Sequence, residues 1–125
     1  MRLASVTPRL ATPDLGRAMR FYAETLGMET RVLWPEAKPT FCILEREGVR
    51  IAFNLSPSPA SGIELYLDVK DVARWHESVK ARVKIEWGPE VYSYGRREFG
   101  FRDPDGNLVI LSEPTTDPVT CIVEE

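Results

Sequence analysis

The sequence has few of the residues that bind transition metals or form disulfides. Its 125 residues include one histidine, His76, and two cysteines, Cys42 and Cys121. Two cysteines cannot build a disulfide framework, and their spacing is not that of a metal site. We expect Cys42 to be buried and Cys121 to lie in a C-terminal tail. His76 falls on the polar side of a predicted helix, so we expect it to face solvent.

The sequence also lacks a long apolar run and an excess of positive charge. No stretch approaches the roughly 18 apolar residues of a transmembrane helix, and residues 1–10 do not resemble a secretory signal. The net charge of −3 gives no basic surface for nucleic acid. The apolar content of 43% and the charged content of 28% are ordinary for a globular protein. We therefore expect one cytoplasmic domain without nucleic-acid or membrane partners.

Apolar periodicity predicts the same order of elements twice. In each half we expect a strand, a helix and three further strands, which makes the chain α+β with two β-α-β-β-β modules. Residues 56–62, rich in serine and proline, form the predicted linker between module one (1–55) and module two (63–113). Together they make one domain over 1–113. We expect residues 114–125 to form a peripheral tail, with completion of a dimer as the alternative.

Short-range signals predict where several elements begin and end. Asp14 and Asp71 are the predicted N-caps of the two helices, and Gly27 is the predicted left-handed residue at the end of the first. The first strand is expected over 3–10. The strand that follows the second helix is expected to end at Gly88-Pro89, because this pair is typical of a turn.

The segment 97–111 is the most informative part of the chain. It contains two apolar stretches separated by Asp103-Pro104-Asp105-Gly106-Asn107. Pro104 presets φ at the second turn position, and Gly106 permits the positive φ needed to re-enter a strand. The segment therefore predicts a β-hairpin that closes the second module.

Two segments together carry a family resemblance. Residues 11–27 read ATPDLGRAMRFYAETLG, and residues 94–99, YGRREF, run into DPDGN at 103–107. They resemble the signatures of the glyoxalase / bleomycin resistance protein / extradiol dioxygenase superfamily, also called vicinal oxygen chelate, over about residues 3–113. The resemblance implies that the two modules form one cup-shaped mixed sheet around a ligand cavity, with the helices outside. It also implies a homodimer.

The resemblance further implies where a metal would bind. Metal-dependent members use inward side chains on the first strand of each module and on the last strand, and the matching positions here are Thr7, Glu64 and Ile110. An isoleucine has no lone pair and a threonine is a weak ligand, so Glu64 would hold a divalent cation almost alone. We therefore predict no metal and no other cofactor. A metal held in a different register, or through Glu98, remains the alternative.

Strand alternation predicts which side chains line the cup. Parity across the hairpin places Glu98 on the same face as Tyr66 and Ile110, although one bulge would reverse it. Aromatic side chains near strand ends can bury a planar ligand, or can instead serve core or interface packing. The predicted ligand-binding residues are Thr7, Arg9, Trp34, Tyr66, Trp87, Tyr92, Tyr94, Glu98 and Ile110.

The predicted function is that of a metal-free binding protein. Like the bleomycin resistance proteins it resembles, it would sequester a hydrophobic or aromatic small molecule. The alternative is a glyoxalase-like lyase or isomerase, or a dioxygenase-like enzyme, using a divalent metal or Glu64 as catalytic base. A degenerate domain without a ligand is a third reading.

Overall fold

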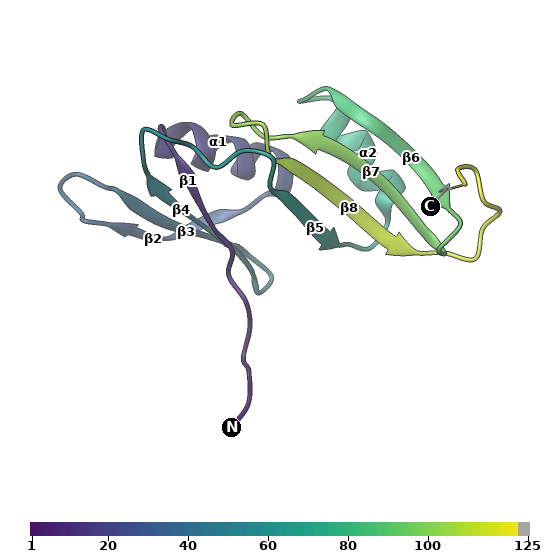
Figure 1. The fold of residues 1–125 in the computed structure, drawn as a ribbon, viewed down its shortest axis with the longest axis horizontal. Coiled ribbons are helices and arrows are strands. Elements are labelled where there is room, and N and C mark those ends of the chain that lie inside the picture. Colours follow the sequence, from purple (N-terminus) through teal and green to yellow (C-terminus); the bar gives the residue numbers. More distant parts are fainter. Residues whose placement is uncertain (123–125) are drawn as a thin grey trace. The chain divides into compact units, whose positions relative to one another are not determined.

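The computed structural model describes residues 1–122, which contain two helices and eight strands. The chain divides into two units, Met1–Ser61 and the part from Gly62 onward. Each unit is one β-α-β-β-β module with its own four-stranded mixed sheet and its own helix (Figure 1). The predicted α+β class and module order are therefore confirmed. Within residues 1–122, neither helix has the length and apolar character needed to cross a membrane.

The first module pairs its first and last strands in parallel. Its sheet has the order β1-β4-β3-β2, with β1 parallel to β4 and the other neighbours antiparallel. The helix begins after Asp14, whose carboxylate accepts a hydrogen bond from the Arg17 N–H, and ends at Gly27 with φ +66°. Both ends match the prediction. Tyr22 of the helix is fully buried against Phe53 of the sheet. The elements are β1 (Arg9–Thr12), α1 (Leu15–Leu26), β2 (Glu29–Trp34), β3 (Phe41–Arg46) and β4 (Val49–Leu55).

The second module repeats this topology with the order β5-β8-β7-β6 and β5 parallel to β8. Asp71 caps its helix as predicted, accepting a hydrogen bond from the Arg74 N–H. Glu113 of the sheet also accepts one from the Val72 N–H at 2.6 Å, which ties the helix start to the sheet. The elements are β5 (Glu64–Asp68), α2 (Val72–Lys80), β6 (Ile85–Tyr92), β7 (Arg96–Arg102) and β8 (Leu108–Pro114). The side chains fully buried between α2 and the sheet include Val72, Val79, Phe99, Phe101, Val109 and Leu111.

The first strand begins later than predicted. The expected strand over 3–10 is replaced by β1, Arg9–Thr12, so Thr7 precedes the strand instead of lying within it. The reason is Pro8: its carbonyl still accepts a hydrogen bond from the Ala52 N–H, but it has no N–H to donate to β4, so the ladder begins with the pair Arg9–Ala52. Leu3 is accordingly exposed.

The strand β6 does not end at Gly88-Pro89, which corrects another prediction. It continues to Tyr92, and its ladder with β7 is irregular between Trp87 and Glu90. A proline has no N–H to donate, but at an irregular stretch of the ladder no regular hydrogen bond is lost. Gly88-Pro89 is therefore accommodated inside β6, which is an edge strand.

His76 and the tail also differ from expectation. His76 is half-buried, with its ring edge-on to Phe99 at 5.3 Å, and does not simply face solvent. The predicted tail spans 114–125, of which 123–125 lie outside the described residues. In the described part, the N–H groups of Thr120 and Cys121 both donate to the Val91 carbonyl, so this segment packs along β6. Cys42 is buried, as predicted, and both cysteines are free thiols.

Candidate functional site

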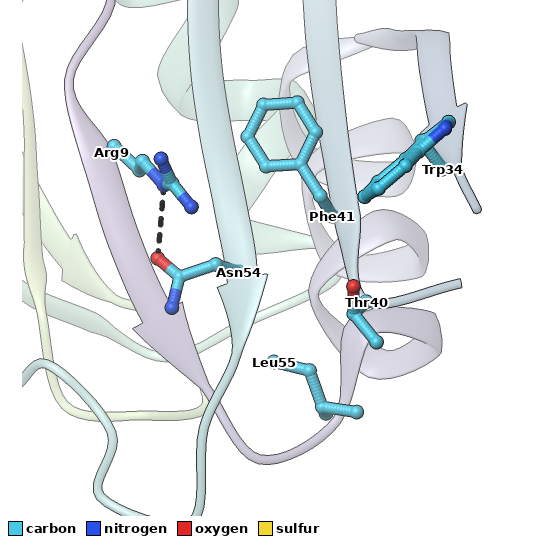
Figure 2. A pocket seen from close by; sticks show the side chains of 6 residues that line it. All are labelled: Arg9, Trp34, Thr40, Phe41, Asn54 and Leu55. Carbon is cyan, nitrogen blue, oxygen red and sulfur yellow. Dashed lines mark hydrogen bonds between the residues drawn. The ribbon is translucent and has the colours of Figure 1, made fainter. Parts of the chain in front are cut away.

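The first module carries an open pocket of about 410 Å³ on the face of its sheet opposite α1. Leu10, Cys42 and Phe53 are buried towards the helix, and alternation along the strands turns their neighbours to the other face. The lining residues are Arg9, Trp34, Thr40, Phe41, Asn54 and Leu55 (Figure 2).

A single cation lies beside aromatic rings in this pocket. Arg9 Nε donates to Asn54 Oδ1 at 3.3 Å, and the guanidinium carbon is 5.0 Å from the centre of the Phe41 ring. In Figure 2 the Phe41 ring stands between Arg9 and Trp34, in keeping with the strand order β1-β4-β3-β2. Trp34 is 64% exposed. The arrangement can hold a planar molecule against the rings and pair its anionic or carbonyl group with Arg9.

A buried carboxylate occupies the corresponding face of the second module. Glu98 of β7 is 2% exposed. Tyr94 donates to one of its oxygens, while Tyr66 donates to the other and Ser112 Oγ lies 2.8 Å from that same oxygen. The ladder pairs Glu98 with Ser112, so strand parity places Glu98 on the face of Tyr66, as the alternation predicts. We call Tyr66, Tyr94, Glu98 and Ser112 the tyrosine–glutamate cluster.

The cluster holds its tyrosines in the neutral form. The pKa of both Tyr94 and Tyr66 is raised. Burial is the larger cause, and the hydrogen bond that each hydroxyl donates to Glu98 is the second. Arg96 completes the network because its Nε donates to Ser112 Oγ at 2.6 Å and its guanidinium pairs with Asp68. The Arg96 side chain therefore reaches across β8 to β5.

Aromatic rings line β6 and the turn beside this cluster. Tyr92 stacks on Tyr94 with ring centres 5.5 Å apart, and Trp87 stands edge-on to Tyr92 at 5.9 Å. Gly100 leaves room for the indole, since a Cβ there would lie 2.8 Å from the Trp87 ring. Ile110 pairs with Gly100 on one side and Tyr66 on the other, so it presents only carbon at the centre of this face.

The predicted site residues lie in two groups, one in each module. Arg9 and Trp34 lie in the pocket of the first module, and Thr7 is half-buried ahead of β1. Glu64 is exposed at the start of β5, so the buried carboxylate on this face is Glu98 and not Glu64. The remaining predicted residues, all in the second module, are Tyr66, Trp87, Tyr92, Tyr94, Glu98 and Ile110.

The predicted site residues leave out several polar contributors, and two of them fix a cation. Asn54 fixes Arg9 in the first module, and Asp68 pairs with Arg96 in the second. The available signal for Asn54 was a polar residue in the otherwise largely apolar strand 49–55. Asp68 follows Glu64 and Tyr66 by alternation, so its face was predictable but its partner was not.

The residues present do not fit a metal ion. Ile110 offers no donor atom, and the Glu98 oxygens already accept hydrogen bonds from three hydroxyl groups. Across residues 1–122, no three His, Cys, Asp or Glu side chains come together in a way that could hold a cation.

Glu98→Gln should lower the pKa of Tyr94 and Tyr66 towards the ordinary value of about 10, because the amide carries no charge. A tyrosine whose pKa is raised by folding stabilises the fold below about pH 10, and this contribution is lost as the pH rises through the folded pKa. Phenolate absorbance, recorded during an alkaline titration, should therefore rise earlier in Glu98→Gln than in the wild type. The matched control is Glu64→Gln, an exposed glutamate on the same face. Identical titrations of Glu98→Gln and the wild type would contradict the assignment.

Comparison with known proteins identifies the family. The sequence model of the Glyoxalase/Bleomycin resistance protein/Dioxygenase superfamily matches residues 2–111. No curated protein matches the chain. Among solved structures, a superfamily member from Sphaerobacter thermophilus is 27% identical, with a TM-score of 0.72 over 89% of this chain and 98% of its own.

Two further solved structures are similar over almost their whole length. A bleomycin-binding protein complexed with bleomycin is 26% identical, with a TM-score of 0.71 over 89% of this chain and 98% of that one. A bleomycin resistance determinant encoded on the transposon Tn5 is 25% identical, with a TM-score of 0.73 over 90% and 98%. Since the family model spans nearly the whole sequence and the fold agrees, the chain belongs to the glyoxalase/bleomycin resistance protein/dioxygenase superfamily.

Proposed function

We propose that this protein is a metal-free binding protein that sequesters a small aromatic molecule. The observation that carries the proposal is the open pocket of the first module, where Trp34 and Phe41 lie beside the cation of Arg9. Its volume of about 410 Å³ is in the range of small-molecule sites. A similar solved structure is a bleomycin-binding protein in complex with bleomycin, which supports binding of a small molecule by this fold.

The metal-free part of the proposal is supported by donor chemistry. Position 110 offers only carbon, the carboxylate at 98 is hydrogen-bonded, and up to residue 122 no three His, Cys, Asp or Glu side chains gather into a donor set. Metal analysis of protein purified without chelator should find far less than one Zn, Ni, Mn or Fe per chain. A stoichiometric amount of any of them would favour the enzyme alternative in its metal-dependent form.

We further propose that the protein acts as a homodimer in the cytoplasm. The edge strand β2 leaves Val32 and Leu33, which do not line the pocket, 39% and 43% exposed. A second chain covering such an edge would remove this apolar surface from water. Light scattering should then give twice the mass of one chain.

Trp34→Ala should weaken binding of 2-naphthoate, a planar aromatic anion, by about tenfold or more, which is about 1.4 kcal/mol. Loss of the exposed indole removes the stacking surface but little of the fold, so stability should change by less than about 0.5 kcal/mol. Affinity is measured by calorimetric titration and stability by urea unfolding.

Arg9→Ala should also weaken the binding of 2-naphthoate, because the positive charge that pairs with the carboxylate of the probe is lost. The matched control is Val49→Ala, an exposed apolar residue of the same sheet that does not line the pocket. Equal affinity in wild type, Trp34→Ala and Arg9→Ala would place the binding site elsewhere and refute this pocket as its location.

A further inference from the structure

We propose that the second module carries a recognition site for protonated aromatic amines, formed by Trp87, Tyr92 and Tyr94 beside the tyrosine–glutamate cluster. The inference rests on the proposed function as a small-molecule binder and names the ligand chemistry for this face. It follows from the direction of the hydroxyl hydrogens, the charges around them and the exposure of the rings.

The hydroxyl hydrogens of the cluster all point inward. A tyrosine or serine hydroxyl has one hydrogen to donate, and those of Tyr66, Tyr94 and Ser112 are directed at Glu98. What the Tyr94 oxygen offers to a molecule outside is therefore a lone pair. A ligand that reaches it must bring its own hydrogen-bond donor.

The charges beside Tyr94 favour a cation. Glu90 pairs with Glu98 across the β6–β7 ladder, which brings two carboxylates to this part of the sheet. Arg96, the cation of the network, is turned away from β6 because its hydrogen bonds run to Ser112 and Asp68 on β8 and β5. A positive ligand group near Tyr94 thus meets attraction from the carboxylates, with the guanidinium directed to the opposite side.

The rings supply the rest of the site. Tyr94 is 54% exposed and is stacked against Tyr92, so part of its ring remains accessible to a ligand ring or to an ammonium group. Trp87 is the third ring and stands edge-on to Tyr92. Its indole fits there because Gly100 has no side chain. An aromatic amine satisfies both features at once, because its ring stacks and its ammonium donates to the Tyr94 oxygen.

The first module offers the opposite chemistry, which provides an internal comparison. Its pocket presents the Arg9 cation, and so favours an aromatic anion. Two probes that share one ring system but differ in charge should therefore distinguish the two modules. We choose 2-naphthylmethylamine, which is protonated at neutral pH, and 2-naphthoate.

The test is a nuclear magnetic resonance titration of the indole N–H signals. The chain has three tryptophans, Trp34, Trp75 and Trp87, each assigned by its own replacement with phenylalanine. The amine should shift the Trp87 signal, and 2-naphthoate should shift the Trp34 signal. Tyr94→Phe keeps the ring but removes the acceptor oxygen, so affinity for the amine should fall about three- to tenfold. The same variant should leave 2-naphthoate affinity unchanged.

Three outcomes would overturn the inference: 2-naphthoate shifts Trp87 as strongly as the amine, the amine shifts only Trp34, or Tyr94→Phe binds the amine as well as the wild type does. If 2-naphthoate binds at Trp34 and the amine binds nowhere, this inference fails and the proposed function stands. If neither probe shifts any signal, both fail. Tyr94→Phe also removes a hydrogen bond from the buried Glu98, so urea unfolding of the variant is measured alongside and its affinities are compared under conditions in which it is folded.

Discussion

Gly88→Ala should destabilise the protein by about 2–5 kcal/mol. Gly88 has φ +81°, a conformation that costs a residue with a Cβ about 1–2 kcal/mol. The added Cβ would also clash with the carbonyl oxygen of Glu98 and lie 2.9 Å from the Phe99 Cα. These are backbone atoms of β7, which is held by ladders on both sides and cannot move cheaply. Overpacking of this kind adds about 1–3 kcal/mol.

The control for Gly88 is Gly106→Ala. Gly106 has a similar φ of +87°, but no atom lies within 4 Å of the position its Cβ would take. Its replacement should cost only the conformational part, about 1–2 kcal/mol. Urea unfolding of both variants measures the difference. Equal losses would mean that β6 and β7 do not approach as closely as the structure shows.

The Gly88 variant also connects stability with the site. Gly88 follows Trp87 directly, so pushing β6 away from β7 displaces the indole from its place over Gly100. We therefore expect Gly88→Ala, where it remains folded, to bind the aromatic amine more weakly. Binding of 2-naphthoate in the first module should be retained, as should the indole signal of Trp34.

Asn107→Ala should cost about 2–3 kcal/mol. Asn107 is fully buried in the turn between β7 and β8. Its side-chain oxygen accepts a hydrogen bond from the Ile63 N–H, and its amide nitrogen donates to Asp103, both at 3.1 Å. Alanine removes both groups and leaves the buried Asp103 carboxylate with one donor fewer, and loss of a partner by a buried polar group costs about 1–3 kcal/mol by itself. The variant would also lose the side-chain bond to Ile63, which precedes β5, while the bond from the Leu108 N–H to the Ile63 carbonyl remains.

Two further variants test which lost contact accounts for the lower stability of Asn107→Ala. Asn54→Ala makes the same chemical change at a half-buried position, where solvent can replace the lost bond, and should cost less than about 1 kcal/mol. Asn107→Asp keeps the acceptor for Ile63 but places a second carboxylate beside Asp103. Its loss of stability at neutral pH should shrink in acid, where a carboxylate is protonated. If the loss of stability in Asn107→Asp did not depend on pH, the contact between positions 107 and 103 would be contradicted.

Short-range signals predicted the ends of elements well. The cap at Asp14, the left-handed Gly27 and the turn from Asp103 to Gly106 all form as predicted. Each depends on contacts between residues a few positions apart, so the local sequence contains the whole interaction. Prediction was wrong for the start of β1 and for the end of β6, because whether a proline ends a strand depends on the hydrogen bonds of the neighbouring strand at that position.

The sequence by itself determined the family, the order of elements and the chemical type of each side chain, including the isoleucine at 110 that offers no donor. Only the tertiary structure decided that Glu98, and not Glu64, is the buried carboxylate, and that Arg9 meets Phe41 and Asn54 at a pocket. The physical reason is the distance along the chain. Tyr66 and Glu98 are 32 positions apart, and they meet because each strand lies beside β8 in a ladder whose register no local pattern encodes.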